Sequence, residues 1–165
     1  MIQKKICILG AAGVGKTSLT AQFVYSKFSE KYLSTMGVKI DRKKVTVGDT
    51  QINLMIWDIH GEEKFKKITS SYLRGASGLI MVVDGTRPDT IDRAKDILQR
   101  VEKDVGCLPY VWLLNKADLT DEWSLSEQHF NELKAMHQPI YRTSAKTGEH
   151  VEDSFLKLSE MLLSA

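Results

Sequence analysis

The stretch GAAGVGKT, residues 10–17, decides the fold of this chain of 165 residues. It has the form G-x-x-x-x-G-K-[ST], in which glycines let the backbone wrap until its N–H groups converge on phosphate oxygens. Lys16 adds a positive charge, and the Thr17 hydroxyl can serve as a Mg²⁺ ligand. The helix after the loop contributes the positive end of its dipole. An apolar run at residues 6–9 and a helical pattern at 16–25 flank it. The sequence therefore predicts a strand, a phosphate-binding loop and a helix, whereas the alternative is a turn that binds nothing.

Strands and helices alternate along the rest of the chain. Gly48-Asp49 joins two segments of alternating polarity and predicts an antiparallel hairpin. Ser124 and Glu127 have capping-box spacing ahead of an apolar stripe at Phe130, Leu133 and Met136, which predicts the start of a helix. The further strands are expected at residues 40–47, 51–57, 79–83, 110–114 and 140–141. Three further helices are expected: one that begins after Pro88 and ends near Gly106, one that begins after Ser124, and one that begins at Val151.

Continuous apolar strands separated by helices are typical of a parallel sheet that is covered on both faces. We expect one α/β domain over residues 1–165, with a mostly parallel six-stranded sheet, one antiparallel edge strand and helices on both faces. In such a sheet, ligands bind outside the carboxyl ends of the strands.

Composition excludes several classes of function. The formal net charge is only +2, from 23 basic and 21 acidic residues, so no large field is available to hold nucleic acid. Cys7 and Cys107 form neither a disulfide framework nor a zinc pattern, which favours core thiols in a reducing compartment. We expect a cytoplasmic monomer with no nucleic-acid partner and no membrane anchor in this chain.

A second stretch, NKAD at residues 115–118, names the base. The Asp118 carboxylate can accept from both N–H groups on the Watson–Crick edge of guanine, whereas adenine offers an acceptor nitrogen there and leaves a carboxylate unpaired. Alone, the stretch is also compatible with a turn that ends in a helix cap. Beside a phosphate loop, it predicts a guanine nucleotide and disfavours an ATP-using kinase or ATPase.

These two stretches together resemble the Ras superfamily of small GTPases, whose motifs recur in the same order over essentially the whole chain. DIHG (residues 58–61) resembles the family's D-x-x-G loop, STMG (34–37) its first switch loop, and SAK (144–146) its last base loop. STMGV (34–38) and ITSSYLRG (68–75) resemble the switch segments of Rab proteins in particular. The resemblance implies a P-loop NTPase fold of the Ras type, and a switch that binds GTP or GDP with Mg²⁺ and hydrolyses GTP slowly.

The resemblance also implies roles for individual residues. Phe28 is expected against the base, and Ile40, Trp57 and Tyr72 form a hydrophobic effector patch unless they only pack the sheet and the switch helix. Effectors, exchange factors and GTPase-activating proteins are expected to bind through residues 27–38 and 58–75. The implied nucleotide-binding residues are Ala12, Gly13, Val14, Gly15, Lys16, Thr17, Ser18, Phe28, Thr35, Gly61, Asn115, Lys116, Asp118, Ser144, Ala145 and Lys146. The implied catalytic residues are Lys16, Thr35, Gly61 and Glu62, and the implied metal ligands are Thr17, Thr35 and Asp58.

Three departures from the family concern hydrolysis. Glu62 stands where the family usually has a glutamine that orients the attacking water; a carboxylate can act as a base or repel the γ-phosphate, and these effects oppose. Ala12 replaces a glycine found in Ras itself. Its methyl group narrows the space through which an inserted arginine would approach. Residues 28–37 contain no arginine, so none is evident there to stimulate hydrolysis in cis. An alternative function is therefore a nucleotide-dependent binding domain with negligible hydrolysis, which would suit a part of a larger protein.

Overall fold

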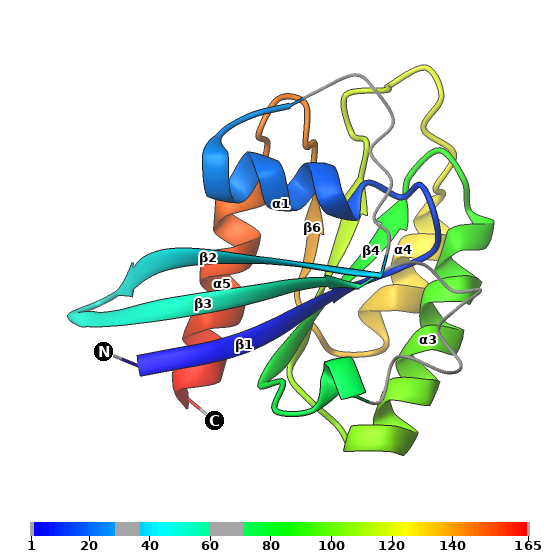
Figure 1. Ribbon diagram of the computed structural model, residues 1–165. Coiled ribbons are helices and arrows are strands. Elements are labelled where there is room, and N and C mark those ends of the chain that lie inside the picture. The colour runs from blue at the N-terminus through cyan, green and yellow to red at the C-terminus, as the bar shows by residue number, and fades with distance from the viewer. Residues whose placement is uncertain (1, 29–36, 60–70, 165) are drawn as a thin grey trace.

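The computed structural model describes residues 2–28, 37–59 and 71–164. Its strands form one six-stranded sheet in the order β2-β3-β1-β4-β5-β6 (Figure 1). The strands are β1 (Ile2–Leu9), β2 (Val38–Val47), β3 (Thr50–Ile59), β4 (Gly78–Asp84), β5 (Tyr110–Asn115) and β6 (Ile140–Arg142). The helices of the described ranges include α1 (Lys16–Tyr25), α3 (Asp89–Val105), α4 (Glu127–Lys134) and α5 (Val151–Ser164).

Pairing in the sheet confirms the expected fold class. β1 lies parallel to both β3 and β4, and the parallel order continues through β5 to β6. Only β2 is antiparallel, and it lies at the edge beside β3. Parallel strands bring their carboxyl ends to one edge of the sheet, so the loops that follow β1, β3, β4, β5 and β6 start close together.

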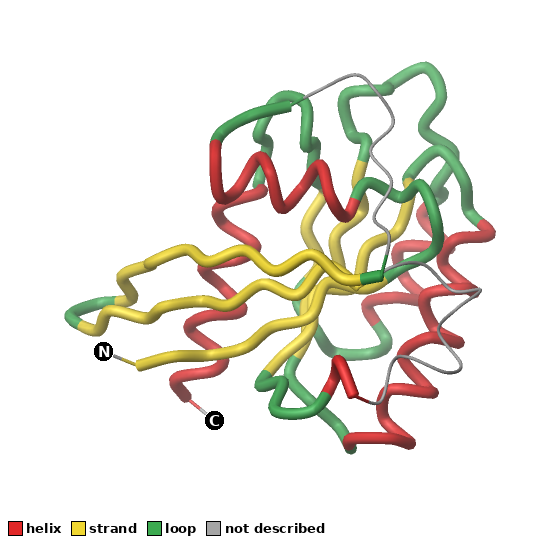
Figure 2. The backbone as a smooth tube through the Cα atoms, in the orientation of Figure 1, coloured by secondary structure: helices red, strands yellow, loops and turns green. Residues whose placement is uncertain are grey.

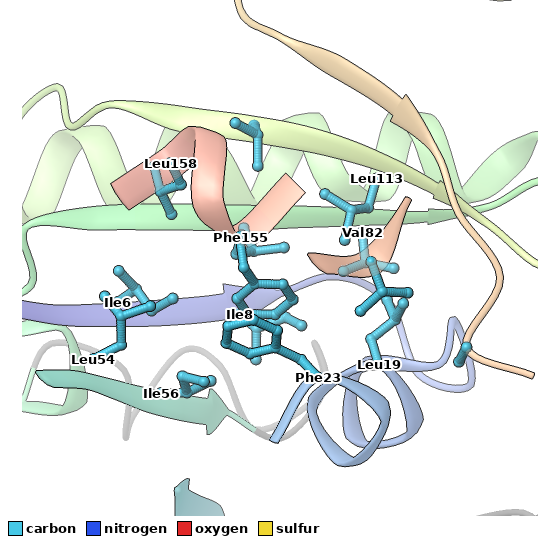
Figure 3. Packing of buried hydrophobic residues seen from close by; sticks show 14 of the residues in the cluster. Ile6, Ile8, Leu19, Phe23, Leu54, Ile56, Val82, Leu113, Phe155 and Leu158 are labelled. Carbon is cyan, nitrogen blue, oxygen red and sulfur yellow. The ribbon is translucent and has the colours of Figure 1, made fainter. Parts of the chain in front are cut away.

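Alternate residues of the buried strands point to opposite faces, and each face has its own core. Ile6 and Ile8 of β1 belong to the cluster covered by α1 and α5. In that cluster the rings of Phe23 and Phe155 stack with centroids 4.1 Å apart, between the two helices and the sheet (Figure 3). Cys7 faces the other way, into the cluster covered by α3 and by Leu133 of α4. Burial on both faces explains why these strands read as continuous apolar runs.

The start of α4 differs from the predicted capping box. The cap is Ser126, whose Oγ accepts from the His129 backbone N–H at 3.3 Å, while His129 Nδ1 accepts from the Ser126 N–H at 3.0 Å. Ser124 is instead held in the preceding loop, where its N–H donates to the Gly85 carbonyl at 2.8 Å. α4 also ends at Lys134, so Met136 lies beyond it. Ser126, with His129 as its partner, is the cap in place of Ser124. It caps the first turn of the same helix and leaves Ser124 to connect the loop before α4 to Gly85.

The two cysteines have different environments, and only one is the expected core thiol. Cys7 is fully buried, and burial raises the pKa of its thiol to about 12, so it is unreactive. Cys107 is exposed after α3, where its Sγ lies 3.1 Å from Glu102 Oε2. Within the described ranges, no helix combines the length and the apolar character needed to cross a membrane.

The stacked ring of Phe155 gives a test of the first core. Phe155 is fully buried, whereas Phe130 on α4 has 40% of its surface exposed. We expect Phe155→Ala to lower the free energy of unfolding by about 4 kcal/mol, because it removes the stacked ring and leaves a cavity. Phe130→Ala is the matched control and should cost less than about 1 kcal/mol. Chemical denaturation measures both, and equal losses would contradict the described core.

Candidate nucleotide-binding site

The loops that follow β1, β4, β5 and β6 lie at one end of the sheet (Figure 2). The loop at residues 10–15 runs from β1 into α1, and the turn of the β2–β3 hairpin lies at the opposite end of the strands. Asp84 and Asn115 end β4 and β5 as register partners. The sheet thus brings together chemically active residues that are far apart in the sequence.

Five successive carbonyl oxygens of the phosphate loop accept hydrogen bonds from side chains. Lys16 Nζ donates to the Gly10 and Ala11 carbonyls, each at 3.3 Å. The donors to the next three carbonyls come from the end of β5 and from the loops after β4 and β5: Arg87 Nη2 to Ala12, Lys116 Nζ to Gly13 and Asn115 Nδ2 to Val14, all at 3.0 Å.

The direction of these carbonyls fixes the direction of the N–H groups. In a trans peptide the C=O and the N–H of the next residue point opposite ways, and the described chain has no cis peptide bond. Holding the carbonyls of residues 12–14 toward side-chain donors therefore turns the N–H groups of residues 13–15 the other way. Convergent N–H groups at a helix N-terminus form an anion-binding site, which is the arrangement that phosphate requires.

Only glycine fits at position 15, where the phosphate loop (residues 10–17) contacts the stretch NKAD (residues 115–118). A Cβ at Gly15 would lie 2.3 Å from Asn115 Nδ2, and its φ of +103° disfavours any side chain. Asn115 is 2% exposed and is held from its other side by Thr143 Oγ1, which donates to its Oδ1 at 3.2 Å. Asn115 thus joins the phosphate loop to the base loops.

Asp84 is a buried carboxylate that organises two cations. Its Oδ2 lies 2.8 Å from Lys116 Nζ and accepts from Arg87 Nε at 3.0 Å, while its Oδ1 accepts from the Thr86 N–H and hydroxyl. Burial alone would raise the pKa of Asp84, but the hydrogen bonds from Lys116, Thr86 and Arg87 outweigh it and lower the pKa. The carboxylate therefore stays ionised at neutral pH.

Thr17 and Asp58 meet at the other side of the phosphate loop. The Thr17 hydroxyl donates to Asp58 Oδ2 at 2.5 Å, and Asp58 is fully buried at the end of β3. Among the residues described, no group of three or more His, Cys, Asp or Glu could hold a metal by itself. One hydroxyl and one carboxylate are hard oxygen donors that suit Mg²⁺, which takes few protein ligands and completes its shell with water and phosphate.

The loops expected to read the base are bound to one another. Asp118 Oδ1 accepts from the Ser144 hydroxyl at 2.8 Å. The Ser144 carbonyl accepts from the Gly148 N–H at 2.8 Å, which turns the Ala145 N–H the opposite way. Gln22 Nε2 on α1 donates to the Ala145 carbonyl at 2.8 Å. The base loops are thus anchored both to β5 and to α1.

Of the other predicted site residues, some lie within the described ranges and some lie outside them. Ser18 lies in the first turn of α1, Lys146 is exposed beside Ala145, and Phe28 has 39% of its surface exposed. Thr35, Gly61 and Glu62 lie outside the described residues.

Sequence reasoning missed Asp84 and Arg87, which contact Lys116 and the phosphate loop. The only available signal for Asp84 was its position as an acidic residue at the end of a buried strand. Nothing marked Arg87, because its partner Ala12 is 75 residues away in the sequence.

The predicted effector patch is continuous in space. Ile40 on β2 is 44% exposed and is the register partner of Trp57 on β3, whose ring centroid lies 6.2 Å from that of Tyr72. Trp57 and Tyr72 also pack partly against the second core. Lys5 Nζ lies 3.6 Å from the centroid of the Trp57 ring, a cation–π contact at the border of this patch.

Comparison with known proteins gives one consistent family. The Ras family matches residues 5–164 of the chain. The chain is similar to GTP-binding protein ypt1 of Schizosaccharomyces pombe, with 34% identity over 163 residues that cover 96% of this chain and 79% of the relative. It is also 36% identical to Ras-related protein Rab-1C of Dictyostelium discoideum, over 94% and 78% of the two chains, and 34% identical to Ras-related protein Rab-7b of Homo sapiens, over 99% and 84%.

The environment of Asp84 gives a test of the site's internal support. We expect Asp84→Asn to lower the free energy of unfolding by about 2 kcal/mol, because it leaves Lys116 and Arg87 without their shared carboxylate. Asp89→Asn is the matched control: Asp89 is 60% exposed in its pair with Arg93, and its loss should cost less than about 0.5 kcal/mol.

The pH dependence of that loss follows from the sign of the pKa shift. A lowered pKa in the folded state means that the contribution of Asp84 is complete above the ordinary carboxyl value of 3.8 and is lost as the pH falls through the lowered value. The difference between wild type and Asp84→Asn should therefore stay constant from pH 8 to pH 5 in chemical denaturation. A difference that disappears within this range would contradict the lowered pKa.

Proposed function

The chain belongs to the Ras family of small GTPases, and from this premise we propose how its own residues bind guanine nucleotide and hydrolyse GTP. The chain is a Rab-like GTPase, a molecular switch that binds and hydrolyses GTP. We assign this activity to one G domain over residues 1–165. The observation that carries it is the row of carbonyls at residues 10–14, all held by side-chain donors.

Guanine recognition is proposed at the loops that follow β5 and β6. Asp118 would accept from the two N–H groups of the guanine edge, and its bond from the Ser144 hydroxyl supports it in that orientation. The Ala145 N–H would donate to the guanine carbonyl, with Lys146 beside it. Phe28 and the stem of Lys116 would cover the two faces of the base; the partial exposure of Phe28 supports its availability.

Phosphate binding is proposed at residues 12–18. The N–H groups of the loop would donate to phosphate oxygens, and the first turn of α1 adds the positive end of its dipole. Lys16 is buried and has its Nζ next to the loop carbonyls, which supports a role in neutralising phosphate charge.

A magnesium site is proposed at Thr17, Asp58 and Thr35. The contact between the Thr17 hydroxyl and the Asp58 carboxylate supports it, because both are hard oxygen donors beside the phosphate loop. When bound, Mg²⁺ would neutralise charge on the phosphates. Asp58 would act through a water, and Thr35 would supply a second hydroxyl from the first switch loop.

Hydrolysis is proposed to proceed by in-line attack of water on the γ-phosphate. Lys16 and the loop N–H groups would stabilise the charge that develops on the transferred group. Thr35 and Gly61 would contact the γ-phosphate and release the switch loops once it is lost, and Glu62 would lie beside the attacking water.

Rab-family GTPases act with regulators and effectors, and we propose where such partners bind this chain. The proposed surface comprises residues 27–38 and 58–75 with Ile40 and Trp57. The exposure of Ile40, its register pairing with Trp57 and the ring contact between Trp57 and Tyr72 support it, since an apolar patch is suited to binding a partner. We propose a cytoplasmic place of action, which the two free cysteines support.

The role of Asp118 is tested by exchanging its acceptor for a donor. Asp118→Asn keeps one acceptor but presents an amide N–H₂ to the guanine amine, so we expect GDP affinity to fall about a hundredfold. Xanthosine diphosphate, which carries a carbonyl in place of that amine, should bind the variant more tightly than GDP does. Fluorescence titration measures both ligands. The exposed Asp121→Asn in the same loop is the control, and equal effects in the two variants would refute the assignment.

The rate of hydrolysis is tested by single-turnover measurement on the GTP-loaded chain. We expect slow intrinsic turnover, on the order of 10⁻³ s⁻¹ or less, because no arginine is evident in the first switch loop. A Lys16→Ala variant purified identically controls for contaminating GTPase. Comparison with Glu62→Gln gives the sign of the net effect of the carboxylate: a faster variant shows that Glu62 serves hydrolysis less well than the family's glutamine, and a slower one shows that it serves better. No turnover above the Lys16→Ala control would contradict the proposed hydrolysis.

A further inference from the structure

Arg87, in the turn between β4 and α3, connects a buried carboxylate to the phosphate loop. Its Nε donates to Asp84 Oδ2 and its Nη2 to the Ala12 carbonyl, both at 3.0 Å. We propose that Arg87 is a positioning residue for the phosphates: it orients the peptide between Ala12 and Gly13 so that the Gly13 N–H donates to bound nucleotide. The inference rests on the proposed binding of phosphate at residues 12–18.

The orientation of the Gly13 N–H follows from the geometry of one peptide unit. The Ala12 carbonyl and the Gly13 N–H belong to the same trans peptide and point in opposite directions. A donor fixed on the carbonyl side therefore fixes the N–H on the other side. Glycine at position 13, with a φ of +76°, gives this peptide little steric restraint of its own. An external hydrogen bond is thus what selects its orientation.

Arg87 also polarises the peptide unit whose carbonyl it contacts. A hydrogen bond from a charged donor to a carbonyl polarises the whole peptide unit and makes its N–H a stronger donor. Arg87 acts in this way on the Gly13 N–H, and Lys116, through the Gly13 carbonyl, acts on the Val14 N–H. The N–H groups of Gly13 and Val14 are thereby each polarised by a different cation. Both cations, Arg87 and Lys116, pair with the same oxygen, Oδ2 of Asp84.

The turn that carries Arg87 is itself held in place by hydrogen bonds and ring packing. The Arg87 N–H donates to the Asp84 carbonyl at 2.9 Å, and the Thr90 hydroxyl donates to the Arg87 carbonyl at 2.7 Å. On the other side the ring of Trp123 covers Gly85 so closely that an added Cβ would lie 2.0 Å from it. Arg142 in turn lies over that ring at 4.1 Å. The guanidinium is therefore presented from a fixed backbone.

An arginine suits this position better than a lysine. The guanidinium is a planar fork that can donate to Asp84 through one nitrogen and to Ala12 through another, whereas an ammonium on a flexible stem is a point charge. Lys116 shows the difference, because its single nitrogen lies 2.8 Å from Asp84 Oδ2 and must also serve the Gly13 carbonyl. Replacing Arg87 with lysine should consequently retain the charge and lose part of the orientation.

The test measures GDP release and the amide spectrum of the same variants. The whole chain is loaded with a fluorescent GDP analogue, and its release is followed for wild type, Arg87→Gln and Arg87→Lys. Arg100→Gln on the exposed side of α3 is the matched control. Proton–nitrogen spectra of the GDP-bound proteins give the Gly13 and Val14 amide shifts separately, and thermal melting reports whether each variant is folded.

We expect Arg87→Gln to release GDP about tenfold faster than wild type, Arg87→Lys about threefold faster, and Arg100→Gln at the wild-type rate. The Gly13 amide proton should move upfield in Arg87→Gln while that of Val14 stays, because its peptide is held by Lys116.

Unchanged release together with an unchanged Gly13 shift would overturn the inference and leave the proposed function intact. Shifts spread over Gly13, Val14 and the rest of the loop with a lowered melting temperature would also overturn it, since they would show a merely structural role. Failure of the wild type to bind the analogue would instead contradict the proposed function itself.

Discussion

The structure of this site depends on the hydrogen bonds that hold the carbonyls of the phosphate loop toward side chains. A glycine-rich loop has many accessible conformations, and only one of them gathers its N–H groups on an anion. Here the donors come from the helix that follows the loop, from the end of β5 and from the loops that follow β4 and β5. The conformation of the loop is therefore held by α1 and by residues at or just beyond the ends of β4 and β5, which couples the site to the fold.

The sheet delivers those donors because of its order and register. β4 and β5 follow β1 in the sheet, so Asp84 and Asn115, which are register partners, end beside the phosphate loop. Asn115 reaches the loop directly, and Asp84 acts through Lys116 and Arg87. Asn115 also accepts from Thr143, so the loops expected to read the base are tied to the loop expected to hold the phosphates. These hydrogen bonds suit a switch in which nucleotide binding and the conformation of the loops must be coupled.

The fold was predicted correctly from the sequence, and most residues of the proposed site were also named there, because both follow from local sequence patterns. Apolar runs ending in glycine, asparagine or aspartate marked the strands, and the two nucleotide motifs lay at their ends. The cap of α4 was misplaced because Ser124 and Ser126 both have cap chemistry, and only the packing of Ser124 on Gly85 separates them. Arg87 was missed for a different reason: its contact with Ala12 joins residues that no periodicity or motif relates.

The most direct test of this account is a crystal structure of the chain with GDP and Mg²⁺. The account predicts that the N–H groups of residues 13–15 lie within hydrogen-bond distance of phosphate oxygens while Arg87, Lys116 and Asn115 keep their bonds to the loop carbonyls. A loop whose peptides have flipped, so that carbonyls face the phosphates or the three side-chain bonds are broken, would contradict it.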